Sequence, residues 1–125
     1  MLAELAEFQF NTLKALEGVV ATIARGAEST EPTTVVLGRV DSQATTTREA
    51  TYTANAQDVL ILDSDYKPTG TPSEPQDGDV ITITQRGFVI TLEARPPNEN
   101  QACFQRWKGG AVFRVHTKIQ SREPV

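Results

Sequence analysis

The sequence predicts a mainly β fold, a small β-barrel or sandwich of about seven short strands preceded by one α-helix. Three observations favour this class. Short runs rich in Val, Ile and Thr recur along the chain, and these residue types are enriched in strands. Turn-forming Gly, Pro and Asp residues separate the runs at regular spacing. Apolar residues at helical spacing occur near the N-terminus.

The N-terminal helix is predicted over residues 2–17, and Gly18 is a suitable stop. A helix this short must dock on something, either its own sheet or a neighbouring subunit. Phe8 points away from the main apolar stripe, so it is either a partly exposed aromatic residue or part of a second contact surface. We assign five apolar side chains of this helix to a subunit interface: Leu2, Leu5, Phe8, Phe10 and Leu13.

The first half of the barrel is predicted from β-branched runs and the polar segments between them. The expected strands are residues 19–25, 33–40, 50–54 and 58–63. Residues 26–32 are polar and rich in turn formers. Residues 41–49 carry no large apolar residue, no Pro and no Gly, which suits an extended loop. Residues 65–75 contain several Pro and Gly residues, so we expect a long loop without a regular element.

The clearest element is a β-hairpin within residues 75–94. Its first strand follows a turn formed by Asp77, Gly78 and Asp79, and a Gly-containing loop at residues 85–87 leads into the return strand. Neither face of the hairpin is strongly charged, so we place it at the centre of the sheet.

The last two strands are predicted at residues 102–107 and 111–118, joined by residues 108–110. The β-barrel then covers residues 19–119, and residues 120–125 are expected to be a flexible tail. At 125 residues the whole chain has the length of a single domain.

Composition limits the possible partners. A formal net charge of −4 is unlike a general nucleic-acid binder, which presents a basic face. It is compatible with a protein that surrounds DNA without gripping it, because a weakly acidic wall repels phosphate. A single cysteine, Cys103, excludes an internal disulfide framework.

No apolar run approaches the roughly 20 residues that a membrane span requires. Glu4 and Glu7 lie where a signal peptide would be basic, and no apolar segment follows them. We therefore expect synthesis in the cytosol and no membrane partner.

The sequence offers no convincing active site, and we predict a protein that is not an enzyme. His116 is the only histidine, and Arg114 and Lys118 on the same strand face oppose its protonation, which makes it a poor general base. Cys103 has no partner nearby in sequence and is expected to be a buried apolar residue. The two could meet if the last two strands pair, but no third group that would orient them is evident.

Metal and cofactor sites are not predicted either. Asp63 and Asp65 offer only two carboxylates, and Lys67 stands where a calcium loop would supply a third oxygen ligand. The Gly-containing turns join strands, whereas a phosphate-binding loop joins a strand to a helix. Aromatic residues make up 6% of the chain and do not alternate with basic residues, as they would in a single-strand binder.

Several short motifs follow one another along the chain in a characteristic order. They are Val20-Ala-Thr-Ile23, Gly38-Arg-Val-Asp41, Val59-Leu-Ile-Leu62, Gln76-Asp-Gly-Asp79, Val80-Ile-Thr-Ile83 and Gly87-Phe-Val-Ile90, then a closing hairpin around Cys103 and Trp107. In this order they resemble the head–tail joining proteins of long-tailed bacteriophages, also called head-completion or stopper proteins. The ending Phe113-Arg-Val-His-Thr-Lys118 is similar to the closing strand of small prophage-encoded virion proteins. The resemblance covers most of residues 5–119.

This resemblance implies a non-enzymatic virion protein at the head–tail junction. Proteins of this family form rings, usually of six subunits, with the portal or an adaptor protein on the head side and a tail terminator or tail protein on the tail side. The ring lines or closes the DNA channel and provides the surface on which the tail docks. Genomic DNA passes through its lumen without sequence recognition.

The resemblance also implies a channel loop between the second and third strands. On this sequence its residues are Asp41, Thr45, Thr46, Thr47, Arg48 and Tyr52. Arg48 is the only charged residue of the Thr-rich tip, so a ring of subunits would form a circle of positive charge able to hold a DNA end.

Two alternatives remain open. The chain could be a tail terminator or another tail or baseplate subunit, since these proteins use comparable small β-domains. It could also be an unrelated small β-barrel that binds a ligand or acts as an enzyme. An acid-rich site converging with His116 and Cys103 would favour the latter, and a concentration-dependent ring in solution would favour the connector. Portal or capsid genes upstream and tail genes downstream would identify a virion protein.

Overall fold

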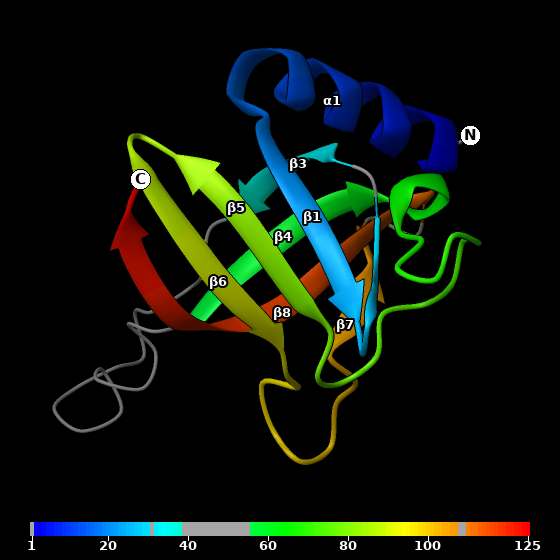
Figure 1. The fold of residues 1–125 in the computed structure, drawn as a ribbon. Coiled ribbons are helices and arrows are strands. Elements are labelled where there is room, and N and C mark those ends of the chain that lie inside the picture. Colours follow the sequence, from blue (N-terminus) through cyan, green and yellow to red (C-terminus); the bar gives the residue numbers. More distant parts are fainter. Residues whose placement is uncertain (1, 31, 39–55, 108–109) are drawn as a thin grey trace, which may run out of the picture.

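The computed structural model describes residues 2–30, 32–38, 56–107 and 110–125. Within these residues the chain forms helix α1 (Leu2–Glu17), a short 3₁₀ helix η1 (Asp63–Asp65) and eight strands (Figure 1). The strands are β1 (Val19–Arg25), β2 (Glu28–Ser29), β3 (Thr33–Gly38), β4 (Ala56–Leu62), β5 (Val80–Gln85), β6 (Phe88–Ala94), β7 (Phe104–Arg106) and β8 (Val112–Pro124).

Six of these strands form a closed antiparallel barrel. Neighbours pair in the order β1-β3-β4-β8-β6-β5, and β5 pairs back with β1 from Val20↔Thr84 to Ala24↔Val80. The short strand β2 pairs with β1, and β7 pairs with β8. The predicted mainly β fold with one N-terminal helix is therefore confirmed, and the alternative between barrel and sandwich is decided for the barrel. Closure pairs each of the six strands on both sides.

The barrel core is built from alternate residues of the strands. Along β5, Ile81 and Ile83 point inward and are buried, whereas Val80 and Thr82 point outward, because successive side chains of a strand face opposite sides. The predicted hairpin is paired on both of its sides, as expected for an internal element. The largest buried side chains of this core are Tyr66, Phe113, Ile23, Ile61, Ile81, Ile83 and Leu92.

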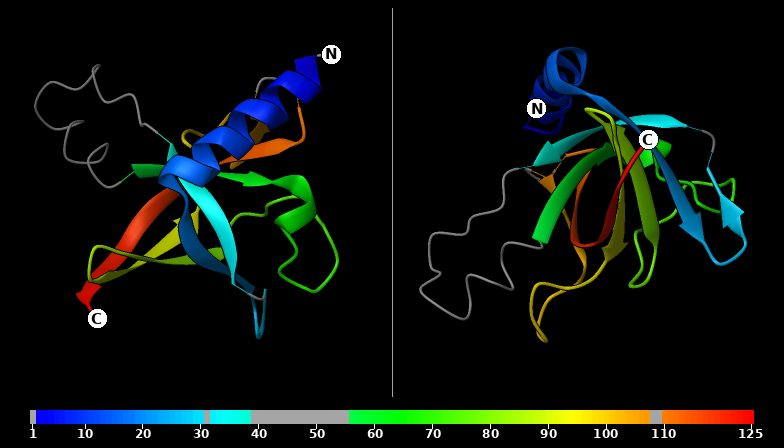
Figure 2. Two further views of the ribbon diagram at one scale, coloured as in Figure 1. Left: turned by 90° about the horizontal axis from the view of Figure 1, so that it is seen from above. Right: turned by 60° about the vertical axis from the view of Figure 1, so that its left-hand side comes forward.

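Helix α1 lies across the outside of the barrel (Figures 1 and 2). Of the two predicted docking possibilities it uses its own sheet: Phe10 packs into a second, smaller core with Val36, Leu60 and Val112, which come from β3, β4 and β8. The helix spans the predicted residues and ends directly before Gly18, whose N–H donates to the carbonyl oxygen of Lys14 at 3.0 Å.

Gly18 is required for the tight passage from α1 into β1. A Cβ atom at this position would lie 2.5 Å from the Lys14 carbonyl oxygen and 2.5 Å from Thr34 Cγ2, which is closer than any side chain tolerates. The helix therefore turns directly onto the strand that begins one residue later.

The prediction for the C-terminus was wrong. Residues 120–125 were expected to form a flexible tail, but β8 continues to Pro124 and pairs with β6 from Thr91↔Ser121 to Phe88↔Pro124. The register shifts between Thr91 and Leu92, where β8 bends to follow β6. Polar residues at the end of β8 misled the sequence-based prediction, because a barrel strand can expose many of its side chains and is held by backbone hydrogen bonds.

Smaller differences concern the segments between strands. The polar region 26–32 contains the two-residue strand β2, and the predicted strand 33–40 is described only as far as Gly38. The strand expected at residues 50–54 lies outside the described residues. The long loop was predicted over residues 65–75; Asp65 is the last residue of η1, and residues 66–79 contain neither helix nor strand. In the described part of the chain, no helix is long and apolar enough to cross a membrane.

Candidate functional site

A buried carboxylate, Asp79, links the long loop before β5 to the barrel. Its side chain is only 2% exposed. Arg25 donates from Nε to Oδ1 at 2.9 Å and from Nη2 to Oδ2 at 2.8 Å. The Tyr66 hydroxyl donates to Oδ2 at 2.7 Å, and the backbone N–H of Gln76 donates to the same oxygen at 3.0 Å. All of these donors stabilise the ionised carboxylate.

The protonation states in this cluster are fixed by these contacts. Burial raises the pKa of Asp79, but the hydrogen bonds from Arg25, Tyr66 and the Gln76 N–H outweigh it, so the pKa lies below its ordinary value. The hydrogen bond to Asp79 raises the pKa of Arg25. Burial and the same carboxylate raise the pKa of Tyr66 well above its usual range. At neutral pH the cluster is therefore an ion pair with a protonated phenol.

Arg25 also fixes the loop itself. Its Nη1 donates to Ser73 Oγ at 3.2 Å, and its Nη2 donates to the carbonyl oxygen of Glu74 at 3.0 Å. The N–H of Ser73 donates to the carbonyl oxygen of Tyr66 at 3.0 Å, while the Tyr66 ring packs edge-on against Phe113 in the barrel core. These contacts explain the long loop at residues 63–75: it inserts an aromatic side chain into the core.

The Asp77, Gly78 and Asp79 segment forms a turn directly before β5. Gly78 has φ +93°, a conformation that favours glycine, and its N–H donates to the carbonyl oxygen of Ala94 at 2.9 Å. The N–H of Ala94 donates in return to the Asp79 carbonyl oxygen at 2.8 Å. This reciprocal pair extends the β5–β6 ladder by one step beyond Val80.

Cys103 is buried, as predicted. Burial and a hydrogen bond with Asp77 raise the pKa of the Cys103 thiol to about 12. The thiol is therefore protonated at neutral pH, and a protonated buried thiol is a poor nucleophile.

A second carboxylate, Asp58 on β4, lies on the outer face of the barrel between two basic residues of β8. Its Oδ2 accepts from Arg114 Nε at 2.6 Å, and its Oδ1 lies 2.9 Å from His116 Nδ1. Burial raises the pKa of Asp58, but the bonds with His116 and Arg114 outweigh it and lower the pKa below its ordinary value. Asp58 is the orienting group for His116 that the sequence analysis missed, because β4 and β8 are far apart in the chain.

The proximity of Cys103 and His116 does not create a nucleophilic pair. Strand β7, which Cys103 directly precedes, does pair with β8, which carries His116, and the N–H of His116 donates to the carbonyl oxygen of Cys103. However, Cys103 belongs to the barrel core, whereas the His116 side chain contacts Asp58 on the outer face. The two side chains therefore lie on opposite sides of the barrel wall.

The side chains of α1 that were predicted to form a subunit interface differ in their burial. Phe10 is fully buried against the chain's own barrel, and Leu13 is partly buried there, so the assignment of Phe10 to a subunit interface is corrected. Phe8 is 69% exposed. It borders a groove of about 390 Å³ that is lined by Phe8, Gln9, Thr12, Leu13 and Trp107. The side chains of Leu2 and Leu5 lie outside what the structure describes.

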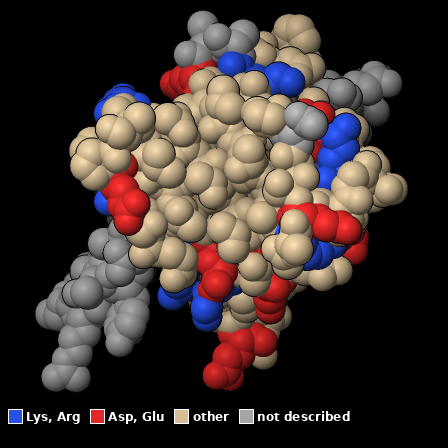
Figure 3. Space-filling view, viewed as in Figure 1, with Lys and Arg blue, Asp and Glu red and all other residues tan. Residues whose placement is uncertain are grey.

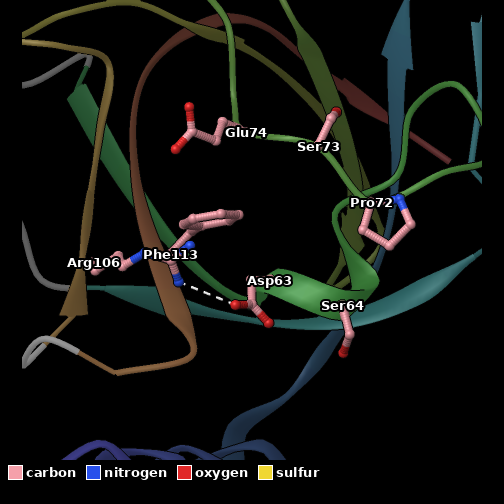
Figure 4. Close-up of a pocket in the computed structure, with 7 residues that line it drawn as sticks. All are labelled: Asp63, Ser64, Pro72, Ser73, Glu74, Arg106 and Phe113. Carbon is pink, nitrogen blue, oxygen red and sulfur yellow. Dashed lines mark hydrogen bonds and ion pairs between the residues drawn. The ribbon is translucent and has the colours of Figure 1, made fainter.

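An open pocket of about 380 Å³ lies between η1 and the loop that precedes β5 (Figure 4). Its lining residues are Asp63, Ser64, Pro72, Ser73, Glu74, Arg106 and Phe113. Arg106 Nη1 pairs with Asp63 Oδ2 at 3.0 Å, and its guanidinium lies 4.9 Å from the centre of the Phe113 ring. Across the described ranges, no group of three or more His, Cys, Asp or Glu side chains is arranged to hold a metal ion.

The predicted channel loop, residues 41–52 with Arg48 at its tip, lies outside the described residues. The strands on either side of it are described. β3 ends at Gly38, which pairs with Asp58 near the start of β4. The described residues on either side of it therefore lie at the same end of the barrel.

The fold and these surfaces define a small closed β-barrel protein whose buried charges are paired for stability and whose outer helix exposes an aromatic side chain. A family model described as the phage head–tail joining protein matches residues 1–124. The chain therefore belongs to the phage head–tail joining protein family, which confirms the resemblance found in its motifs. No curated protein and no solved structure gives a significant match.

Membership of this family makes the chain a structural connector protein and a component of the bacteriophage virion. Its partners are other components of the phage head and tail.

Proposed function

We propose that this chain forms a ring in the head–tail connector, between the portal and the tail, with residues 1–125 acting as one domain. As the family resemblance implies, the ring has six subunits, lines or closes the DNA channel and provides the surface on which the tail docks. One observation carries the proposal: of the two phenylalanines of α1, Phe10 is buried against the chain's own barrel, whereas Phe8 is 69% exposed.

A ring requires two different contact surfaces on each subunit, because its contacts are heterologous. The outer surface of α1 supplies one of them. An exposed aromatic residue beside an apolar groove is typical of the centre of a protein interface. Leu2 and Leu5 extend this surface toward the N-terminus in the proposal.

The channel loop supplies the contact with DNA. Residues 41–52 project into the lumen, and Arg48 of each subunit contributes to a circle of positive charge. Such a circle holds the terminal phosphates of the packaged genome by electrostatic attraction, while the acidic remainder of the chain lets DNA pass.

Complementation of a phage that lacks this gene tests the location. With the wild-type chain, particle imaging should show density of rotational symmetry at the portal–tail junction. Without it, DNA-filled heads should fail to join tails. A tail terminator would instead copurify with free tails from a mutant that makes no heads, and this result would contradict the proposal.

The proposed role of the channel loop, residues 41–52, is tested in the same particles. Arg48→Glu should reverse the charge in the lumen and cause loss of packaged DNA or failed tail attachment, whereas Arg48→Lys keeps the charge and serves as the control. DNA content per particle is the measurement. Normal DNA retention and normal tails in the Arg48→Glu particles would rule out this role for the loop.

A further inference from the structure

The outer face of β1, β5 and β6 is almost free of charge. Two cross-strand rows form its centre, one with Val20, Thr84 and Val89 and the next with Thr22, Thr82 and Thr91. We call these six residues the β1–β5–β6 face. Charged residues border these rows: Glu93 of β6 lies opposite Val80 in the row that follows, and Glu123 of β8 lies opposite Val89 in the first row.

Figure 3 views the molecule from the side on which β1, β5 and β6 lie in Figure 1. Uncharged residues cover the middle of this side, and Lys, Arg, Asp and Glu residues gather at its periphery. A continuous uncharged area surrounded by charged residues is the arrangement of an interface centre and its rim.

Exposed apolar side chains concentrate at one end of the β1–β5–β6 face. Val20 is 55% exposed on this face, and Phe88 is 37% exposed at the adjoining rim of the barrel, on the side of β6 opposite to Val89. The C-terminal Val125 is close by, because its N–H donates to the carbonyl oxygen of Gly87 in the β5–β6 turn. The N-terminal half of α1, which carries Phe8, lies on the other side of the molecule (Figures 1 and 2).

The charge of the chain favours a second copy as the partner of this face. Each copy carries a formal net charge of −4, so a face without charge lowers the repulsion between two copies. A face of Val and Thr offers no positive charge to the phosphates of DNA and no counter-charge to a strongly charged protein surface.

The dimensions fit the centre of an interface. Three strands at about 4.8 Å spacing and about five residues of each at about 3.3 Å span roughly 14 by 16 Å, or about 230 Å². A stable protein interface uses about 800 Å² per partner. The β1–β5–β6 face therefore supplies the uncharged middle, and the surrounding charged residues supply the rim.

We propose that the β1–β5–β6 face of one subunit binds the α1 surface around Phe8 of the next. This inference rests on the proposed ring and names its subunit contact. A face that bound its own copy would give a closed two-fold dimer, whereas a face that binds a different surface can continue around a ring. Phe8 is the most exposed aromatic residue of the described chain, and aromatic rings pack well on β-branched side chains.

Two charge-introducing variants test the contact in solution, Val20→Asp on the sheet face and Phe8→Asp on the helix. Both side chains are mainly exposed, so the variants should fold, as checked by circular dichroism and thermal unfolding. Sedimentation should show self-association weakened on the order of a hundredfold in each variant. Gln105→Glu, an exposed position on β7, is the matched control and should associate as the wild type does. Unchanged association of either test variant overturns the proposal.

Mixing the two variants distinguishes a head-to-tail contact from a symmetric one. The Val20→Asp chain keeps an intact helix surface and the Phe8→Asp chain keeps an intact sheet face, so a mixture should form a dimer that does not grow further. A Phe8→Asp chain that dimerises alone through its sheet face overturns the proposal.

If the wild-type chain is monomeric in solution, cross-linking in assembled particles tests the same contact. A chain carrying Phe8→Cys and Val20→Cys should form a ladder of disulfide-linked oligomers under oxidation, and the two single variants should not. A disulfide within one chain links no second subunit, so a ladder on a denaturing gel reports bonds between different subunits. A symmetric ring in the particles without a ladder overturns this contact and leaves the proposed function standing. Particles without a ring refute the proposed function itself.

Discussion

Arg25 and Asp79 form a bidentate ion pair, 2.9 Å from Nε to Oδ1 and 2.8 Å from Nη2 to Oδ2, although they lie 54 residues apart in sequence. They directly follow Ala24 and precede Val80, the last residues paired between β1 and β5. Because the pairing of β1 with β5 closes the barrel, this ion pair completes the closing contact. It also holds the loop at residues 66–79, through Tyr66 and the backbone of Gln76.

Removing the charge of Asp79 should destabilise the fold strongly. In Asp79→Asn the guanidinium of Arg25 loses its buried counter-charge, and the Tyr66 hydroxyl faces a weaker acceptor. Breaking a buried pair in this way costs roughly 3 kcal/mol, a large part of the stability of a small domain. Urea unfolding followed by circular dichroism measures the loss.

Glu74→Gln is the matched control for Asp79→Asn. It removes one negative charge from the same loop, but its side chain is exposed and Arg25 contacts only its backbone oxygen. Its free energy of unfolding should stay within about 0.5 kcal/mol of the wild type. Equal stability of the two variants would show that the ion pair does not stabilise the barrel.

The stability contributed by Asp79 should depend on pH in one direction. Its pKa is lowered in the folded chain, whereas an unfolded Asp has a pKa of about 3.9. The contribution is therefore complete above the unfolded pKa and is lost as the pH falls through the folded pKa. The difference in unfolding free energy between the wild type and Asp79→Asn should be constant from pH 7 to about 5 and shrink below about 4. A difference that stays constant down to pH 2 would contradict the lowered pKa.

Local patterns in the sequence were sufficient for much of the fold. Helix α1, strand β1 and the β5–β6 hairpin lie where apolar periodicity and turn residues predicted them. The contacts of Asp79 were not predictable in the same way. Its partners Arg25 and Tyr66 meet it only because the barrel closes, and no local signal encodes that closure. The pairing of Asp58 with Arg114 and His116 was missed for the same reason, since it requires β4 beside β8.

Two phenylalanines of one helix should behave oppositely on substitution. Phe10→Ala removes a fully buried ring from the small core beneath α1 and should lower the unfolding free energy by about 3–5 kcal/mol. Phe8→Ala changes a mainly exposed side chain and should leave the stability within about 0.5 kcal/mol of the wild type. Chemical denaturation of both variants is the measurement. A small effect of Phe10→Ala would mean that α1 does not depend on the barrel for its position.

The end of β8 gives a final prediction, and it separates a structural strand from a dispensable tail. Deletion of residues 121–125 removes the partners of four β6 residues, Phe88 to Thr91, together with Arg122, whose guanidinium lies 5.1 Å from the centre of the Phe88 ring. Lost backbone hydrogen bonds at about 1 kcal/mol each should cost about 2–4 kcal/mol in total. The exposed edge of β6 should also promote aggregation, measured by light scattering. Deletion of Val125 alone keeps all four pairs and is the control. Full stability after the longer deletion would show that this part of β8 does not support the barrel.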